Sequence, residues 1–87
     1  MTRLRLGAAA VNQTPLAWET NRRHILAAMA AARDAGVGVL CLPELCVTGY
    51  GCEDMFLATG VQQAAVEMLL ELVPATTGMV ASLGLPI

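Results

Sequence analysis

The sequence predicts an α/β fold in which helices connect parallel strands. Residues 3–11 alternate in part between apolar and polar side chains, and residues 37–42 form a short apolar run, so both segments are typical of strands. Between them, residues 18–35 are rich in alanine and have the composition of a helix. A strand, a helix and a strand in this order form a βαβ unit, which implies parallel neighbours and a right-handed crossover.

The first strand and the first helix have recognisable boundaries. The strand at Arg3–Val11 runs into the polar, proline-containing segment Asn12–Pro15, where we expect it to end. The helix is expected from about Trp18 to Ala35, with Gly36 as its C-cap. Two adjoining flanks should make its apolar face broad, namely Leu26, Met29, Ala30 and Arg33 on one and Ile25, Ala28, Met29 and Ala32 on the other.

The second half of the chain continues the same pattern. Val37–Leu42 is almost wholly apolar, which predicts a strand buried on both faces. After this strand the sequence predicts, in order, a loop at Thr48–Asp54, a short turn at Met55–Ala58, a second helix at Val61–Val73 and a third strand at Met79–Leu85. Pro74 is expected to end the second helix. Its inward side chains should be Val61, Ala64, Ala65, Met68, Leu69 and Leu72.

The composition is unusually apolar for a chain of this size. Of the 87 residues, 56% are hydrophobic and 14% are charged, whereas about 25% of an ordinary soluble domain is charged. Two helices and three strands cannot hide this much apolar surface. We therefore expect residues 1–87 to be one piece of one domain, cut short, that is completed by a larger domain or by a partner.

Charge and cysteine content exclude several classes of protein. The net charge is −2 and all five basic residues are scattered arginines, which argues against nucleic-acid binding. No apolar segment is long and uninterrupted enough to predict a membrane span. Three cysteines are an odd number with no metal-binding spacing, so neither a disulfide framework nor a metal site is expected. A cytoplasmic location is the default expectation.

Glu44 is the strongest candidate for chemistry. It follows the apolar run at Val37–Leu42, and reactive groups of α/β folds collect where such strands end. In a dry pocket, burial would disfavour the charged form of this carboxylate and make it a stronger base. The alternative is an ordinary solvated loop carboxylate, because acidic side chains are mostly exposed.

Four segments carry a resemblance to a known family. The segment Leu42–Tyr50 resembles the first catalytic motif of the nitrilase (carbon–nitrogen hydrolase) superfamily. Three further segments, Gly51–Phe56, Ala10–Leu16 and Ser82–Pro86, resemble the N-terminal glutaminase domains of the glutamine-dependent NAD synthetase family. The resemblance implies that residues 1–87 are the N-terminal part of an αββα-sandwich domain, with about three strands and two main helices.

The resemblance also implies a Glu–Lys–Cys catalytic set. Glu44 matches the glutamate, which acts as general base on a cysteine thiol. The thiolate attacks the side-chain amide of glutamine, a lysine stabilises the oxyanion, and ammonia is released. This chain contains no lysine, and the family places both the lysine and the nucleophilic cysteine later in the sequence. Residues 1–87 are therefore predicted to be inactive alone.

The implied partners follow from the same resemblance. The substrate would be glutamine, and the ammonia would serve the ATP-dependent conversion of deamido-NAD to NAD. ATP and magnesium would bind a synthetase domain outside these residues, so no cofactor is expected here. The protein is expected to be a homo-oligomer. Two alternatives are a free-standing amidase or carbamoylase of the same superfamily, and a truncated module that only packs against a partner.

The remaining candidate residues have a structural alternative each. Tyr50 is expected to wall the glutamine pocket, or else to anchor the loop by packing. If Cys46 lies on an extended segment, it points the same way as Glu44, but a small packing residue is the simpler interpretation. His24 is expected on a helix surface, and Trp18 is expected to be a core or subunit-contact anchor.

Overall fold

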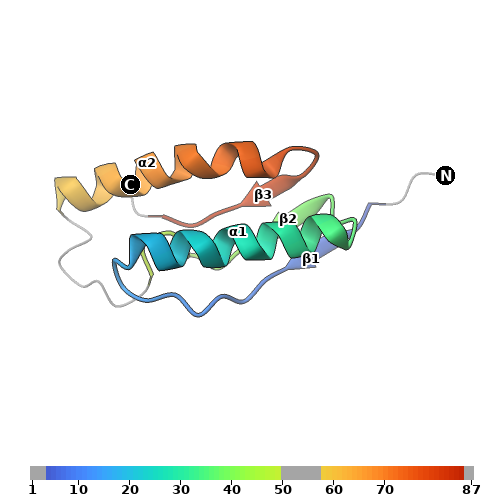
Figure 1. Cartoon of the computed structure of the whole chain (residues 1–87), viewed down its shortest axis with the longest axis horizontal. Coiled ribbons are helices and arrows are strands. Elements are labelled where there is room, and N and C mark those ends of the chain that lie inside the picture. The colour runs from blue at the N-terminus through green and yellow to red at the C-terminus, as the bar shows by residue number, and fades with distance from the viewer. Residues whose placement is uncertain (1–3, 50–57, 86–87) are drawn as a thin grey trace.

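The computed structural model describes residues 4–49 and 58–85. Within them, three short parallel strands form one sheet in the order β1-β2-β3, and two α-helices pack on it (Figure 1). The elements are β1 (Leu6–Ala8), α1 (Trp18–Asp34), β2 (Val39–Cys41), α2 (Thr59–Leu72), the 3₁₀-helix η2 (Val73–Thr76) and β3 (Val80–Ser82). The predicted βαβ unit and its parallel pairing are confirmed.

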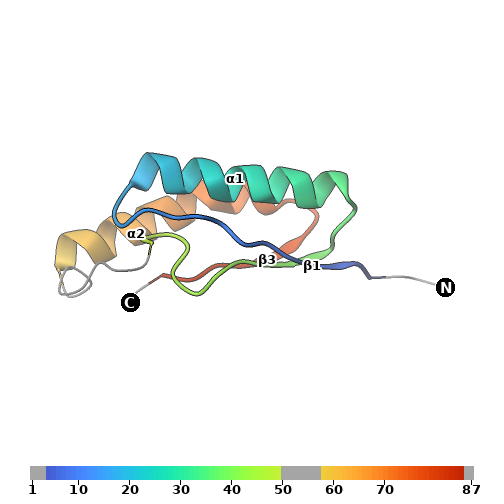
Figure 2. The ribbon, with the colours of Figure 1, turned by 90° about the horizontal axis from the view of Figure 1, so that it is seen from below.

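Both helices cover the same face of the sheet. Figure 2 shows α1 and α2 on one side and the strands on the other. The strand order explains this placement: each crossover moves one position in the same direction along the sheet, so crossovers of one hand bring both helices to one face. The opposite face has no layer packed on it in the described part of the chain.

Helix α1 begins and ends within one residue of its predicted limits. Its buried side chains, Ile25, Met29 and Ala32, come from one of the two predicted flanks. Ala30, on the other flank, is exposed, so the buried stripe is narrower than predicted. Gly36 adopts a φ of +75°, the left-handed conformation that a glycine after a helix adopts without strain.

Helix α2 begins two residues before the predicted position. It buries Val61, Ala65, Met68 and Leu72, one side chain per turn, whereas the inward-predicted Ala64 and Leu69 are only partly buried. The α-helical hydrogen bonding stops at Leu72, and Pro74 lies in the first turn of η2. A proline fits there because the first turn of a helix leaves its N–H groups unpaired.

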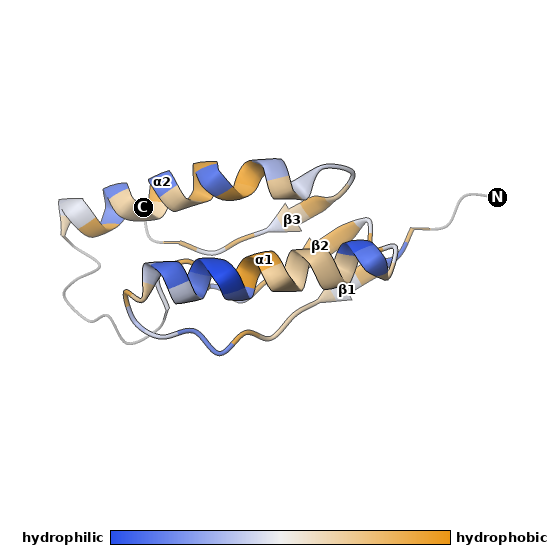
Figure 3. Ribbon diagram, viewed as in Figure 1, coloured by the Kyte–Doolittle hydropathy of each residue, from blue (hydrophilic) through white to orange (hydrophobic). Residues whose placement is uncertain are grey.

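The prediction that the second strand is buried on both faces is wrong. In β2, Leu40 is 2% exposed and faces the helices, whereas the next residue, Cys41, is exposed on the other face. Leu6 and Val80 flank Val39 in register on that open face and are 70% and 67% exposed. Sequence hydrophobicity indicates an apolar strand, but it does not say which layers cover it. Figure 3 shows the hydrophobic colouring of β2 and β3.

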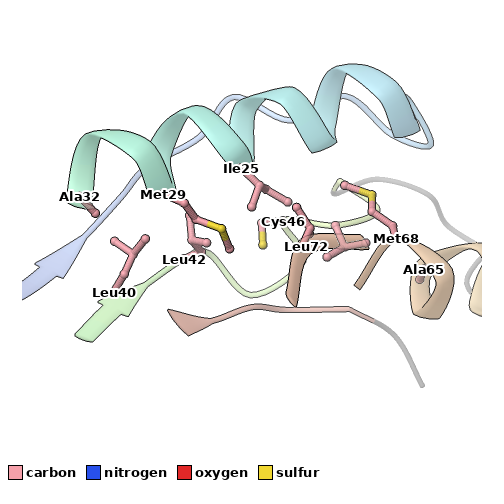
Figure 4. Close-up of a cluster of buried hydrophobic side chains, with 10 residues drawn as sticks. Ile25, Met29, Ala32, Leu40, Leu42, Cys46, Ala65, Met68 and Leu72 are labelled. Atoms are coloured by element: carbon pink, nitrogen blue, oxygen red, sulfur yellow. The ribbon is translucent and has the colours of Figure 1, made fainter. Parts of the chain in front are cut away.

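The core lies between the covered face of the sheet and the two helices. Its buried side chains come from α1, β2, α2 and the turn after β2 (Figure 4), and they are Ile25, Met29, Ala32, Leu40, Leu42, Cys46, Val47, Ala65, Met68 and Leu72. The turn after β2 thus belongs to the core, and it also carries Glu44. Among the described residues, no helix is both long enough and apolar enough to cross a membrane.

Candidate active site at the carboxyl edge of the sheet

Three chain segments meet where the parallel strands end. Residues 43–49, which we name the motif turn, follow β2, while residues 9–16 follow β1 and residues 83–85 follow β3. Backbone hydrogen bonds join them: the N–H of Leu16 donates to the carbonyl of Thr48 at 2.8 Å, and the N–H of Val47 donates to the carbonyl of Gly84 at 3.2 Å. The candidate Glu44 therefore lies at the carboxyl edge of the sheet, the usual position of reactive groups in α/β folds.

The motif turn is one compact helical turn and not an extended segment. The N–H of Gly49 donates to the carbonyl of Leu45 at 2.8 Å, and the N–H of Cys46 donates to the carbonyl of Pro43 at 3.3 Å. Glu44 and Cys46 consequently do not share a direction, contrary to the expectation for an extended segment. The Glu44 side chain is exposed, whereas Cys46 is 0% exposed and points into the core (Figure 4).

Glu44 is exposed within the described part of the chain. A dry pocket would have to be walled by apolar side chains, but the apolar neighbours of this turn face the core on its other side. The described residues fix the backbone of Glu44 and leave its carboxylate open to solvent. They do not themselves desolvate it.

Two glycines let neighbouring backbones approach the motif turn closely. A Cβ atom on Gly84 would overlap the backbone carbonyl of Glu44 and lie 2.7 Å from its Cα. A Cβ on Gly49 would lie 2.8 Å from the carbonyl carbon of Thr14, and Gly49 also has a φ of +83°. Contacts below 3.0 Å are not tolerated by a real Cβ. The glycines therefore let the segments after β3 and after β1 pack directly on the motif turn.

Asn21 is a buried polar side chain beneath the turn. It lies on the buried stripe of α1 and is 0% exposed. Its Oδ1 accepts from the N–H of Thr14 at 3.0 Å, and its Nδ2 donates to the carbonyl of Thr14 at 2.8 Å and to that of Val47 at 3.4 Å. One amide thus ties together α1, the segment after β1 and the motif turn, and these bonds offset the cost of burying it.

Gln13 makes a second link from the same segment. Its Nε2 donates to the carbonyl of Cys46 at 2.6 Å and to the carbonyl of Asn21 at 3.1 Å. Its Oε1 lies 2.7 Å from Nδ1 of His24 on α1. His24, which was expected on a helix surface, is partly buried by its position and makes this contact. Gln13 and His24 are both partly buried.

Cys46 matches the packing interpretation, whereas Cys41 does not. Burial raises the pKa of the Cys46 thiol, so the protonated form is favoured, and its Sγ lies 4.0 Å from the carbonyl of Gly84. A buried thiol with a raised pKa is a poor nucleophile. Cys41 lies exposed on the open face of the sheet. In the described ranges, no three His, Cys, Asp or Glu side chains come together as a metal site would require.

A surface groove separates the outer sides of α1 and α2. Arg22 on α1 bridges Glu19 at 2.6 Å and Glu71 of α2 at 3.1 Å, and the hydrogen bond and charge of Arg22 lower the pKa of Glu19. Trp18 lines the groove and also packs against the core, as one of its two predicted roles required. These exposed ion pairs stabilise little, and the groove lies on the helices, apart from the motif turn.

Comparison with known proteins identifies the fold. The model of the carbon–nitrogen hydrolase family matches residues 5–86. This chain belongs to the carbon–nitrogen hydrolase family. The motif turn lies within the residues that match this family.

The curated relatives that this chain matches are much longer. The chain is 37% identical over 89 residues to a glutamine-dependent NAD(+) synthetase of Oryza sativa subsp. indica, and 38% identical over 89 residues to one of Arabidopsis thaliana. Each match covers 100% of this chain and 12% of the relative. The chain therefore spans about an eighth of the length of these curated relatives.

A solved structure gives the same result in three dimensions. The crystal structure of a glutamine-dependent NAD(+) synthetase from Cytophaga hutchinsonii is 52% identical and superposes with a TM-score of 0.94. The match covers 97% of this chain and 14% of that chain. The predicted superfamily and the nitrilase-like α/β fold are thus confirmed. Tyr50, Cys52 and the predicted turn at residues 55–57 lie outside the described residues.

The candidate site includes residues that sequence reasoning missed. Asn21 had a usable signal, since it precedes Ile25 and Met29 at helical spacing and so continues the buried stripe of α1 with a polar residue. Such a position predicts a buried amide that needs partners. Gln13 and Gly84 lay within segments that resembled the family, but no local pattern indicated what they contact. Their partners are distant in sequence.

Proposed function

We propose that this chain forms the beginning of a glutaminase domain, which hydrolyses glutamine and supplies ammonia for the ATP-dependent conversion of deamido-NAD to NAD. The observation that carries this proposal is the match to the Cytophaga hutchinsonii glutamine-dependent NAD(+) synthetase, at 52% identity and a TM-score of 0.94. Curated relatives with the same name from plants, yeast and animals support it.

In this proposal Glu44 is the general base. The motif turn holds its backbone at the carboxyl edge of the sheet, and its carboxylate is open to a reacting group. The base takes the proton of a cysteine thiol, and the thiolate attacks the glutamine amide while ammonia leaves. The buried Cys46 does not serve as that nucleophile. Residues 1–87 contain no lysine, so the lysine of the set lies outside them. We place the nucleophilic cysteine outside them as well.

The other parts of the proposal concern regions beyond the described residues. Tyr50 walls the glutamine pocket, and residues outside this chain complete the pocket around Glu44. ATP and magnesium bind a synthetase domain outside these residues. The whole protein is a cytoplasmic homo-oligomer, and residues 1–87 alone do not hydrolyse glutamine.

The test compares two nitrogen sources in the full-length protein. Glu44→Gln is expected to lower glutamine-dependent NAD synthesis by about 10²- to 10⁴-fold, the usual contribution of a general base. Synthesis from free ammonia should stay within about twofold of the wild type, because it needs no amide hydrolysis. Glu67→Gln removes an exposed carboxylate of α2 and is the matched control.

Three outcomes would count against this function. Equal loss of both activities in Glu44→Gln would contradict the assignment of Glu44 as base. Glutamine hydrolysis by residues 1–87 alone would contradict a divided catalytic set. Hydrolysis of another amide, without any NAD synthesis, would favour a free-standing amidase of the same family.

A further inference from the structure

Three consecutive carbonyl groups of the motif turn receive donors from one short stretch of chain. The carbonyl of Cys46 accepts from Nε2 of Gln13 at 2.6 Å, and that of Thr48 accepts from the N–H of Leu16 at 2.8 Å. Between them, the carbonyl of Val47 accepts from Nδ2 of Asn21 at 3.4 Å. The side of the turn that faces α1 is therefore fixed at each of these positions.

The opposite side of the turn is fixed by residues 83–85, which follow β3. Gly84 lies against the backbone of Glu44 with no room for a side chain, and its carbonyl accepts the N–H of Val47 at 3.2 Å. Leu16, which is not a glycine, has a positive φ of +56°. Such a conformation persists only where its surroundings impose it, and here it directs the N–H of Leu16 at the turn. The turn is thus held from both sides.

The contacts of Gln13 determine which ring nitrogen of His24 carries a proton. Nε2 of Gln13 faces two carbonyl oxygens, so the amide cannot be reversed without placing its own oxygen against them. Oε1 of Gln13 therefore faces Nδ1 of His24, at 2.7 Å. An amide oxygen only accepts hydrogen bonds, and so Nδ1 of His24 must carry the proton. Protonation at Nε2 would leave this donor in place.

We propose that Gln13 and His24 are positioning residues for Glu44. His24 donates through Nδ1 and fixes the orientation of the Gln13 amide, and Gln13 in turn holds the carbonyl of Cys46, two residues after the base. This inference rests on the proposed function only for the identity of the reaction. The hydrogen-bond chain from α1 to the motif turn stands on the geometry alone. Asn21, whose backbone carbonyl also accepts a hydrogen bond from Gln13, is buried, whereas Gln13 and His24 are partly exposed.

The kinetic test uses the full-length protein and both nitrogen sources. Gln13→Ala is expected to lower kcat for glutamine hydrolysis by up to about 100-fold, because small displacements of a reacting group cost that much. The KM for glutamine and the ammonia-dependent rate should change less than about twofold. His24→Phe should lower kcat by about tenfold. Arg23→Ala, an exposed neighbour of His24 on α1, is the control.

Rescue by a conservative variant separates positioning from packing. His24→Asn places an amide nitrogen near the position of Nδ1, so it should restore kcat to within about threefold of the wild type, whereas His24→Phe keeps only the size of the ring. Equal kcat values for His24→Asn and His24→Phe would overturn the proposal. A parallel loss of ammonia-dependent synthesis in either His24 variant would also overturn it, since that pattern indicates a general folding defect.

A spectroscopic measurement tests the geometry independently of the reaction. In protein labelled with ¹⁵N-histidine, the signal of His24 is assigned by its loss in His24→Asn. The expected pattern is a neutral ring with the proton on Nδ1, or a ring protonated on both nitrogens, and a neutral ring with the proton on Nε2 would overturn the proposal. If Glu44→Gln keeps full glutamine hydrolysis, the assignment of Glu44 as general base fails, while this measurement still tests the hydrogen-bond chain.

Discussion

At the carboxyl end of the sheet, buried amides and closely packed backbones join the chain segments, whereas at the amino end exposed arginines join them. Asn21 is 0% exposed and bonds to two segments other than its own, and Gly84 lies directly on Glu44. At the other end, Arg33 donates to the carbonyls of Ala75 and Thr77, and Arg5 donates to the carbonyl of Ala35, all in exposed positions.

The difference teaches where the fold is fixed most strongly. Exposed hydrogen bonds compete with water and contribute little. A buried amide that loses its partners leaves unpaired polar groups in the core, which is costly. The end of the sheet that carries Glu44 is therefore held by interactions that tolerate little change. At the other end, exposed hydrogen bonds link the segments that connect strands and helices, and these bonds contribute less to stability.

The largest expected effect is at Gly84. Gly84→Ala should destabilise the protein by about 4 kcal/mol or more, because the new Cβ overlaps the Glu44 backbone and no flexible side chain can move away. Gly78→Ala, at the amino end of β3, meets nothing within 4 Å and only strains a φ of +82°. It should cost about 1 kcal/mol. Urea unfolding of both variants measures the two losses of stability. Equal losses would contradict the difference between the two ends of the sheet.

A smaller effect is expected at Asn21. Asn21→Ala removes three hydrogen bonds to Thr14 and Val47 and leaves buried polar groups without partners. It should lower the free energy of unfolding by about 2–3 kcal/mol. Asn12→Ala, an exposed amide nearby, should change it by less than about 0.5 kcal/mol. Thermal unfolding monitored by circular dichroism compares them, and a neutral Asn21→Ala would show that these bonds do not fix the motif turn.

The smallest effect is expected at the amino end of the sheet. Arg33→Ala removes exposed hydrogen bonds to the carbonyls of Ala75 and Thr77. The free energy of unfolding should fall by only about 0.5 kcal/mol, and the change should shrink further in high salt. Urea titrations at low and high salt provide the measurement. A loss as large as that of Asn21→Ala would contradict the difference between the two ends.

The sequence by itself determined the types and order of the elements and the family. Apolar periodicity located both helices to within about two residues, because side chains that share a helix face recur at a fixed spacing. Gly36 and Pro74 marked the ends of α1 and α2, since their backbone limits act locally. The position of Glu44 at the end of β2 followed from the same local pattern.

Only the tertiary structure decided what surrounds that position. The strands lie in the sheet in sequence order and their crossovers have the same handedness, so both helices lie on one face of the sheet. Only that face of β2 is therefore covered, although its sequence is apolar throughout. The contacts of Gln13 and Gly84 with the motif turn join residues that are distant in the chain, and no local periodicity encodes such a pair. Local patterns specify elements because their causes are local, whereas the setting of Glu44 arises only when three strand ends meet.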